Sequence, residues 1–333
     1  MLQPPIPPTP AGVTLAGKTV IVTGGNAGLG FEAARQFLTL HAARVILACR
    51  SLSRGEKAAA ALRADPEVQQ KNPNAVVEVF ELDLADYQSG LRFAQKVKKE
   101  VRELDILLNN AGQVLIKYTK APTGHEMSMQ VNCYTQILIT LELLPLLRGT
   151  AKLRGSPTRV TFTGSNTHVT QETVSKRPVK PDETTLGHFD DPAHFSRFYR
   201  YADTKLCIHA YVRKLAQIAP DEVIVNNLCP GMVQTGLDKN LPLPLRITMV
   251  LVRKGFGRTV QEGARTLVYA AAVAGKETNG KYLQHNQIHQ GAAYLSTPEG
   301  RKFIDGLWKE TVADCAKIDQ ELRAYSEVGK ADM

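Results

Sequence analysis

The chain has 333 residues, of which 43% are hydrophobic and 22% charged, with a net charge of +9 and a pI of about 9.3. This composition is typical of a soluble globular protein with a well-buried core. The positive charge is not gathered into basic blocks interleaved with aromatic residues, which argues against a nucleic-acid partner. It fits a solvated basic surface, with a smaller contribution from steering an anionic ligand.

The first residues, MLQPPIPPTPAG, lack the basic and apolar regions of a signal peptide, so residues 1–16 are expected to form a disordered or extended proline-rich arm. No apolar run approaches the ~20 residues of a membrane-spanning helix. The apolar stretch Leu241–Val252 is short and contains Arg246, so a lid or a peripheral membrane contact suits it better. The five scattered cysteines match neither a disulfide framework nor a zinc site and favour a reducing, cytoplasmic setting.

In chain order, apolar runs of strand length alternate with stretches of helical spacing. Strands are expected at Val20–Thr23, Ala43–Cys49, Ala75–Leu84, Asp105–Gly112, Arg159–Ser165, Val223–Gly231 and Lys281–Leu283. Helices are expected at Phe31–Leu40, Ser53–Ala64, Tyr87–Leu104, Thr123–Leu147, Tyr201–Ala219 and Val260–Ala274. This alternation predicts an α/β fold, a doubly wound parallel sheet with helices on both faces. We expect one domain at residues 17–290, with insertions around 168–197 and 236–258, and a helical C-terminal extension at 291–333.

The first predicted strand is followed by a glycine-rich turn and then by a helix. The expected ligand contacts in this turn are Gly24, Asn26, Gly28, Leu29 and Gly30. Glycines let a ligand approach the backbone, while the helix N-terminus offers unpaired N–H groups and the positive end of a dipole. Although glycine-rich turns are common, this arrangement predicts a phosphate site.

The end of the second predicted strand indicates which dinucleotide binds. An NAD site would place a carboxylate about 20 residues after the glycine turn, where it holds the ribose hydroxyls. Here the strand ends in Cys49 and Arg50, without an acidic residue. A guanidinium binds a 2′-phosphate through charge-assisted hydrogen bonds, whereas a carboxylate would repel it. Arg50 therefore favours NADP(H), the alternative being an ordinary surface arginine.

Ligands of a doubly wound sheet lie across the carboxyl ends of its strands, so the other strand ends supply the remaining candidate contacts. These candidates are Asp83, Leu84, Asn110, Ala111, Gly112, Pro230, Gly231, Val233 and Thr235. Asp83 and Leu84 are placed to meet the adenine. Asn110 can bridge neighbouring strands beside the ribose, although an ordinary turn would have the same composition. The turn at Pro230–Thr235 offers a rigid backbone and a hydroxyl to the nicotinamide.

Tyr201 and Lys205 lie four residues apart, on one face of a predicted helix. A nearby cation favours the phenolate and lowers the tyrosine pKa, which yields an acid/base usable at physiological pH. Ser165, at the end of the fifth predicted strand, would project beside this tyrosine and hydrogen-bond a substrate carbonyl or alkoxide. Asn132 is a polar residue in an apolar helix. It is expected either as a satisfied core amide or as the holder of a water that relays protons to Lys205.

The motifs TGGNAGLG, NNAG, Asn132, Ser165, Tyr201…Lys205 and PGMVQT, in this order and spacing, resemble the short-chain dehydrogenase/reductase family over residues 17–290. The stretches GKTVIVTGGNAGLG, VILACR, GHEMSMQVN and TVQEGARTLVYAA resemble its retinol-dehydrogenase-like branch. The resemblance implies a Rossmann fold, a catalytic tetrad made of these four residues, and hydride transfer between nicotinamide and a carbonyl or alcohol carbon. In the reducing direction, Tyr201 would donate the proton while Lys205 binds the ribose hydroxyls. Gly164 stands where the branch usually has a second serine, which leaves the Ser165 hydroxyl in place.

The expected substrate is a lipophilic ketone or aldehyde, of polyketide, terpenoid, steroid or retinoid type, because apolar residues of Gly236–Arg258 suggest a pocket cover. The insertion His168–Arg197 is expected to build a wall or lid over that pocket. A homodimer through the long helices is common in the family, although this branch includes monomers. His285 and His289 lie four residues apart without further ligands nearby, so no metal is expected. Two alternatives stay open: a catalytically silent NADP(H)-binding sensor or scaffold, and an NAD-linked alcohol dehydrogenase.

Overall fold

The computed structural model describes residues 3–170, 174, 176–234 and 252–328 of the chain. Its centre is an eight-stranded sheet with strand order β3-β2-β1-β4-β5-β6-β7-β8. The strands are β1 (Thr19–Thr23), β2 (Arg44–Cys49), β3 (Val76–Glu81), β4 (Ile106–Asn109), β5 (Thr158–Thr163), β6 (Val223–Cys229), β7 (Tyr282–Gln284) and β8 (Gln287–His289). Strands β1 to β7 run parallel, and β8 pairs antiparallel with β7. The predicted α/β doubly wound sheet is confirmed, and its strand order reverses between β1 and β4.

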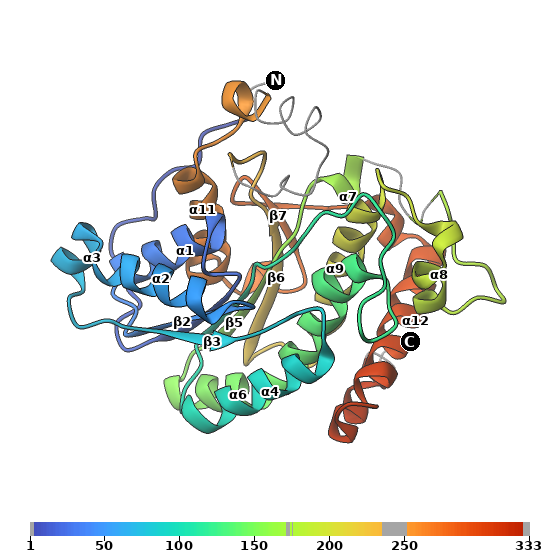
Figure 1. Cartoon of the computed structure of the whole chain (residues 1–333), viewed down its shortest axis with the longest axis horizontal. Coiled ribbons are helices and arrows are strands. Elements are labelled where there is room, and N and C mark those ends of the chain that lie inside the picture. Colours follow the sequence, from blue (N-terminus) through green and yellow to red (C-terminus); the bar gives the residue numbers. More distant parts are fainter. Residues whose placement is uncertain (1–2, 171–173, 175, 235–251, 329–333) are drawn as a thin grey trace.

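Helices cover both faces of the sheet (Figure 1). On one face lie α1 (Gly28–Thr39), α2 (Leu52–Arg63) and α11 (Val260–Val268), and on the other lie α4 (Tyr87–Glu100), α6 (Thr135–Arg154) and α9 (Arg200–Leu215). Alternate residues of β1 serve the two layers, because Val20 and Val22 join the core under α1 while Ile21 joins the core under α6. Burial on both faces explains why the central strands are almost continuously apolar.

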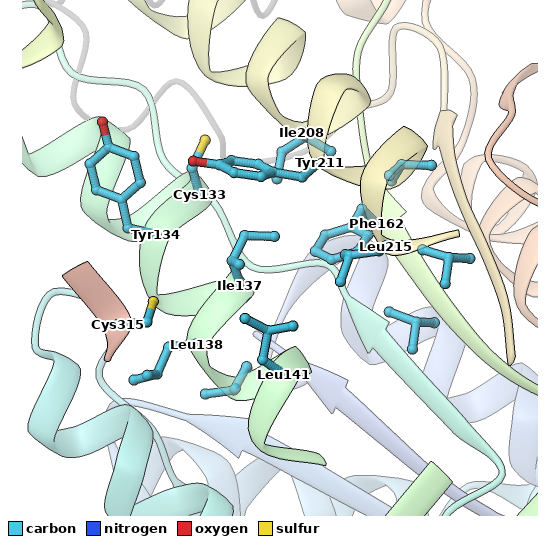
Figure 2. Close-up of a cluster of buried hydrophobic side chains, with 14 of the residues drawn as sticks. Cys133, Tyr134, Ile137, Leu138, Leu141, Phe162, Ile208, Tyr211, Leu215 and Cys315 are labelled. Carbon is cyan, nitrogen blue, oxygen red and sulfur yellow. The ribbon is translucent and has the colours of Figure 1, made fainter. Parts of the chain in front are cut away.

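The larger of the two cores lies between the sheet, α6 and α9 (Figure 2). Its labelled side chains are Cys133, Tyr134, Ile137, Leu138, Leu141, Phe162, Ile208, Tyr211, Leu215 and Cys315. Phe162 of β5 is fully buried. Because each fully buried side chain of this size contributes ~1.5–3 kcal/mol relative to exposure, this cluster holds α6 and α9 firmly against the sheet. No helix in the described part of the chain combines the length and apolarity needed to cross a membrane.

The predicted helix Thr123–Leu147 begins and ends later than expected. The helix α5 (Met127–Met129) leads into a π-helical turn, η1 (Gln130–Tyr134), and then into α6. Pro145 lies inside α6 without ending it, although proline removes a helix hydrogen bond. The turn beyond the proline is held by packing, because Leu147 is buried and the Thr150 hydroxyl accepts a hydrogen bond from the Leu104 N–H at 2.9 Å.

The chain contains further helices. They are α3 (Pro66–Lys71), α7 (Thr167–Thr170), α8 (Thr185–Asp190), η2 (Pro192–His194), η4 (Tyr269–Val273), η5 (Lys276–Thr278), η6 (Ala293–Ser296), α12 (Pro298–Cys315) and η7 (Gln320–Tyr325). The long helix α12 packs against both α8 and α9 (Figure 1). Glu310 of α12 accepts hydrogen bonds from the N–H groups of Thr185 at 3.0 Å and Leu186 at 2.9 Å, at the start of α8.

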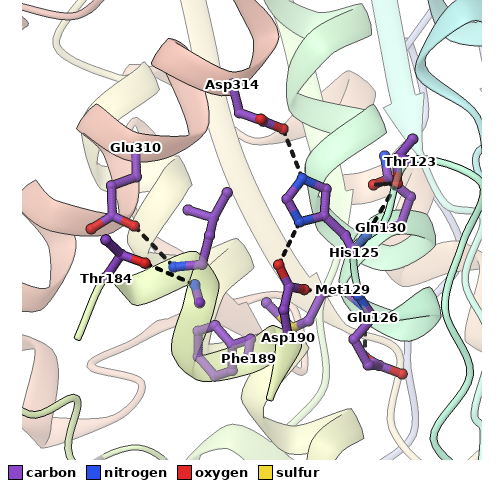
Figure 3. Close-up of polar contacts among 12 residues, drawn as sticks. Thr123, His125, Glu126, Met129, Gln130, Thr184, Phe189, Asp190, Glu310 and Asp314 are labelled. Carbon is purple, nitrogen blue, oxygen red and sulfur yellow. Dashed lines mark hydrogen bonds and ion pairs between the residues drawn. The ribbon is translucent and has the colours of Figure 1, made fainter. Parts of the chain in front are cut away.

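A histidine lies between two carboxylates where α8, α12 and the segment before α5 meet (Figure 3). His125 Nδ1 is 2.6 Å from an Asp190 oxygen, and His125 Nε2 is 2.8 Å from an Asp314 oxygen. Burial disfavours the charged imidazole, but the hydrogen bonds to both carboxylates raise the pKa of His125 to about 9. The charged histidine therefore ties the insertion and the C-terminal helix to the central domain.

The carboxyl edge of the sheet closes with a hairpin between β7 and β8. The turn residues His285 and Asn286 have φ values of 56° and 62°, as a tight two-residue hairpin requires. The sequence predicted a strand at Lys281–Leu283 that ends in a loop, and the structure instead returns as β8. The pairing of β7 with β6 sets Gln284 opposite Cys229 and so places His285 near the end of β6.

Candidate active site

A cavity of about 510 Å³ opens at the carboxyl ends of the central strands. It is lined by predicted site residues from five separate segments, namely Leu29, Asn110, Ser165, Tyr201, Pro230, Gly231 and Val233. The switch in strand order between β1 and β4 lies at this edge, where ligands of doubly wound sheets bind. The fold thus brings Leu29 at the end of the glycine turn together with Ser165 and Tyr201 at one cavity, whereas Asn132 and Lys205 do not line it.

The glycine turn between β1 and α1 is shaped for an anion. Gly24 and Gly28 have left-handed φ values of 66° and 55°, which favour glycine. A Cβ on Gly30 would lie 2.5 Å from the Asn110 Nδ2, so this position tolerates no side chain. Helix α1 has no side-chain cap and no acidic residue in its first turn, which leaves its first N–H groups to an anionic ligand. Asn26 is half-buried in this turn.

Asn110 joins three strands at the edge of the sheet. Its Nδ2 donates to the carbonyl of Thr23 at 3.0 Å, and its Oδ1 accepts from the hydroxyl of Thr163 at 3.4 Å. The N–H groups of Asn110 and Ala111 both donate to the Thr23 hydroxyl, at 2.9 Å and 3.0 Å. This bridging is the arrangement predicted for an asparagine after β4, and Gly112 continues the same compact turn.

The predicted adenosine side of the site lies at the ends of β2 and β3. Arg50 is exposed directly after β2, and no side-chain partner for it occurs among the residues that the structure describes. Asp83 accepts a hydrogen bond from the Ala85 N–H at 3.0 Å, which turns the chain away from β3. Leu84 is buried, and its carbonyl accepts from the Thr135 hydroxyl at 2.8 Å. Arg50 is therefore free to bind an anionic group.

Tyr201 and Lys205 lie one turn apart on α9, and Ser165 follows β5. Burial raises the pKa of Tyr201 well above its usual value, although a hydrogen bond from Ser165 opposes this rise. Lys205 Nζ lies 5.5 Å from the centroid of the Tyr201 ring and donates to the carbonyl of Thr163 at 2.6 Å. Burial lowers the pKa of Lys205 to about 8. The expected lowering of the tyrosine pKa is not found here, because desolvation of the phenol outweighs the hydrogen bond from Ser165 and the charge of Arg253.

Asn132 lies in the π-helical turn η1 and has its amide fully paired. Its Oδ1 accepts from the N–H of Gln113 at 2.8 Å, and its Nδ2 donates to the Gln113 carbonyl at 2.9 Å and to the Thr204 hydroxyl at 3.2 Å. A Cβ on Gly112 would lie 3.3 Å from this Oδ1. Of the two expectations, the structure gives the satisfied amide, which fixes the turn after β4 against α9. A water relay to Lys205 stays a prediction.

The turn after β6 is held in place by the N-terminal arm and by α11. Gly231 has a φ of 82°, and a Cβ there would lie 2.1 Å from the Gln3 Oε1. Val233 is buried and packs against Gly263 of α11, where a Cβ would meet its methyl group at 2.7 Å. Thr235 lies outside the described residues, as does most of the predicted cover, residues 236–251.

Some residues that line the cavity were not predicted. Cys229 ends β6, and its sulfur accepts from the N–H groups of Asn166 at 3.2 Å and Gly231 at 3.3 Å. Its place directly before Pro230 could have marked it as a site residue. Gln3 and His285 also line the cavity, but Gln3 comes from the N-terminal arm and His285 from the hairpin between β7 and β8. No local sequence pattern identifies either residue as part of the site.

The insertion and the histidines carry further expectations. Within His168–Arg197, Thr170 lines the cavity, whereas α8 lies against α12 rather than over the predicted substrate pocket. Among the described residues, Glu183, His188 and His194 place their ligand atoms within 4.8 Å of one another. There, His188 Nδ1 is 2.9 Å from a Glu183 oxygen, and the two imidazole rings stack at 4.1 Å. The expected absence of a metal stays a prediction.

Comparison with known proteins supports the resemblance to short-chain dehydrogenases. The model of a family described as short chain dehydrogenase matches residues 18–174. The short chain dehydrogenase sor7 of Hypocrea jecorina (strain QM6a) is 65% identical over 86% of this chain and 80% of its own length. The short chain dehydrogenase macD of Penicillium terrestre is 39% identical over 96% of this chain and 97% of its own. The solved RhlG/NADP active-site complex of Pseudomonas aeruginosa is similar with a TM-score of 0.60 and 25% identity, covering 81% of this chain and 95% of that one.

Proposed function

The chain belongs to the short chain dehydrogenase family, and from this premise we propose that it is an NADP(H)-dependent reductase of a lipophilic ketone or aldehyde. The observation that carries this proposal is the meeting of Ser165, Tyr201 and the end of the glycine turn at one cavity. A sensor or scaffold would need the glycine turn and Arg50, but it would not need Tyr201 beside Lys205. The paired side chains on α9 therefore favour an enzyme.

In this proposal Tyr201 donates the proton. Because burial raises its pKa, the phenol keeps its proton at neutral pH and transfers it to the substrate oxygen as that oxygen becomes an alkoxide. Ser165 holds the same oxygen through its hydroxyl. Lys205 is a cation below its pKa of about 8, so it stabilises the phenolate that remains after the transfer. NADPH, when bound, supplies the hydride for the carbonyl carbon.

The preference for NADP(H) rests on the end of β2. Arg50 is exposed and lacks a side-chain partner in the described part of the chain, and β2 itself ends without an acidic residue. A free guanidinium there favours a 2′-phosphate, and the uncapped start of α1 suits the pyrophosphate. The NADP complex among the similar structures is consistent with this choice. The cellular supply of NADPH would in turn favour reduction.

The substrate class follows from the cavity. Its volume of about 510 Å³ is in the range of pockets that bind drug-sized molecules. Leu29, Met232, Val233 and Phe256 give it apolar walls. Met232 and Phe256 remain 38% and 58% exposed, although large apolar side chains are usually buried. An apolar substrate would cover them, so a bulky lipophilic carbonyl compound fits better than a small sugar.

The compartment is inferred from the thiols. All five cysteines are free and buried. Proteins of oxidising compartments usually pair their cysteines, whereas cytosolic reductants keep thiols free. We therefore expect the protein to work in the cytoplasm, which also holds the NADPH that the proposed reaction consumes.

The test is an NADPH-consumption screen over lipophilic ketones and aldehydes, with small sugars for comparison. For a substrate that is turned over, Tyr201→Phe should lower kcat by about 10²–10⁴-fold and leave NADPH binding unchanged. Tyr199→Phe is the matched control, because the residue four positions after Tyr199 is Asp203 rather than a lysine. Tyr199→Phe should keep its activity. NADPH binding without turnover of any carbonyl compound would favour the sensor or scaffold instead.

A further inference from the structure

The N-terminal arm is bound along the edge of the cavity. Residues 3–10 form no helix or strand, yet the Ile6 side chain is only 2% exposed. The Ile6 N–H donates to a Glu262 oxygen at 2.8 Å, and Arg265 donates to the Ile6 carbonyl at 2.8 Å. Glu262 and Arg265 both belong to α11. The arm therefore has a fixed place on the folded domain.

Gln3 joins the arm to the turn after β6. Its Oε1 accepts from the Met232 N–H at 2.8 Å, and its Nε2 donates to the Met232 carbonyl at 3.0 Å. The same Nε2 donates to the Phe256 carbonyl at 3.1 Å. Both donor hydrogens of the amide and one lone pair are thereby used. The side chain thus pairs both main-chain groups of Met232, next to Gly231, whose lack of a side chain makes room for it.

Arg258 forms a second link between the N-terminal arm and the turn after β6. Its side chain is buried, and it donates to the carbonyls of Pro230 at 3.0 Å and Pro4 at 2.6 Å. It also donates to His285 Nδ1 at 2.8 Å. A planar guanidinium offers several N–H groups in a fixed geometry, so one residue ties the turn, the arm and the hairpin together.

Gln3, Met232, Phe256 and His285 line the cavity that contains Tyr201. We propose that the N-terminal arm is a wall of this cavity and that Gln3 is a positioning residue, which holds the Pro230–Val233 turn for cofactor and substrate binding. This inference rests on the proposed function. Residues before the Rossmann domain thereby take part in binding, although the described arm residues form no hydrogen bond with Ser165 or Tyr201.

Gln3→Ala removes all three hydrogen bonds, and Gln3→Glu keeps the size but offers carboxylate oxygens to two carbonyl groups. Pro5→Ala is the matched control, because Pro5 is an exposed residue of the same arm. Both Gln3 variants should raise the KM for the ketone and the Kd for NADPH on the order of tenfold, the usual cost of losing about one hydrogen bond. Their kcat should change little, since Gln3 does not touch the reacting atoms. The affinity tag belongs at the C-terminus, so that the arm is not displaced.

Hydrogen exchange in the protein without cofactor gives a readout that is independent of turnover. The Met232 amide should exchange faster in both Gln3 variants than in the wild type and in Pro5→Ala. Unchanged exchange at Met232, or wild-type KM and Kd values in Gln3→Ala, would overturn the inference. A wild-type protein that reduces no ketone with NADPH would overturn the proposed function and this inference with it. An active wild type matched by its Gln3 variants would refute the inference alone.

Discussion

Replacing His125 with glutamine should lower the free energy of unfolding by about 3 kcal/mol at neutral pH and by much less at high pH. In the folded protein, hydrogen bonds to Asp190 and Asp314 outweigh burial and raise the pKa of His125 from 6.5 to about 9. One pKa unit corresponds to about 1.4 kcal/mol, so this rise from 6.5 to about 9 is worth about 3.5 kcal/mol at most, and somewhat less at neutral pH. Glutamine fills similar space but cannot carry the charge.

The pH window follows from the two pKa values. The folded protein holds the His125 proton up to a pH of about 9, whereas the unfolded chain releases it above 6.5. The stabilisation is therefore complete below pH 6.5 and is lost as the pH rises through 9. At the acid end, the hydrogen bond from His125 overcomes burial and lowers the pKa of Asp314 from 3.8 to about 2, so the same ion pair weakens as the pH falls through that range.

Urea unfolding followed by fluorescence measures this effect, because the single tryptophan, Trp308, lies on α12, the helix that also carries Asp314. The wild type and His125→Gln should differ below pH 6.5 and converge above pH 9. His41→Asn is the control, because His41 is exposed and has a φ of 71° that asparagine accepts. A stability difference that is equal at both pH values would refute the assigned role of the charged imidazole.

Two further predictions concern the cofactor and the assembly. Arg50→Ala should raise the Kd for NADPH by 10-fold or more, in line with the loss of a charge-assisted contact, and leave the Kd for NADH nearly unchanged; equal wild-type affinities for the two would contradict the assignment. The full chain should be a monomer by light scattering after size exclusion, because α12 covers α9 and the Tyr211 hydroxyl bonds the Thr311 hydroxyl at 2.6 Å. A dimer at micromolar concentration would show that this covered face does not block association.

The parallel sheet and the position of the site could be predicted because each depends on short stretches of sequence. An apolar run identifies a strand, and the residues after it lie at the carboxyl edge, as Asn110 and Ser165 do. The order of the motifs then brings Tyr201 to the same edge. The family is confirmed by the relatives, whereas the retinol-dehydrogenase-like branch stays a prediction.

Tertiary contacts decided what could not be predicted. The helix continues past Pro145 because Leu147 and the following turn are packed, and this packing outweighs the helix-breaking tendency of the proline. The tyrosine pKa rises because Tyr201 is desolvated, which a pattern of spacing does not report. Gln3 and Arg258 reach the site from distant segments, and each looks like an ordinary polar residue in its own neighbourhood.

The contacts of the arm also set an order of events during synthesis. Gln3 bonds a residue 229 positions later, and Ile6 is held by one 259 positions later. A ribosome releases the N-terminus first, so the arm leaves the exit tunnel long before its partners on α11 exist. Pairings over such separations form late in folding. A nascent chain that stops before Val260 contains β1 to β6 and the segments that carry Asn132, Ser165 and Tyr201, yet the mouth of its cavity is unfinished. Completion of the binding site therefore coincides with near-completion of the polypeptide.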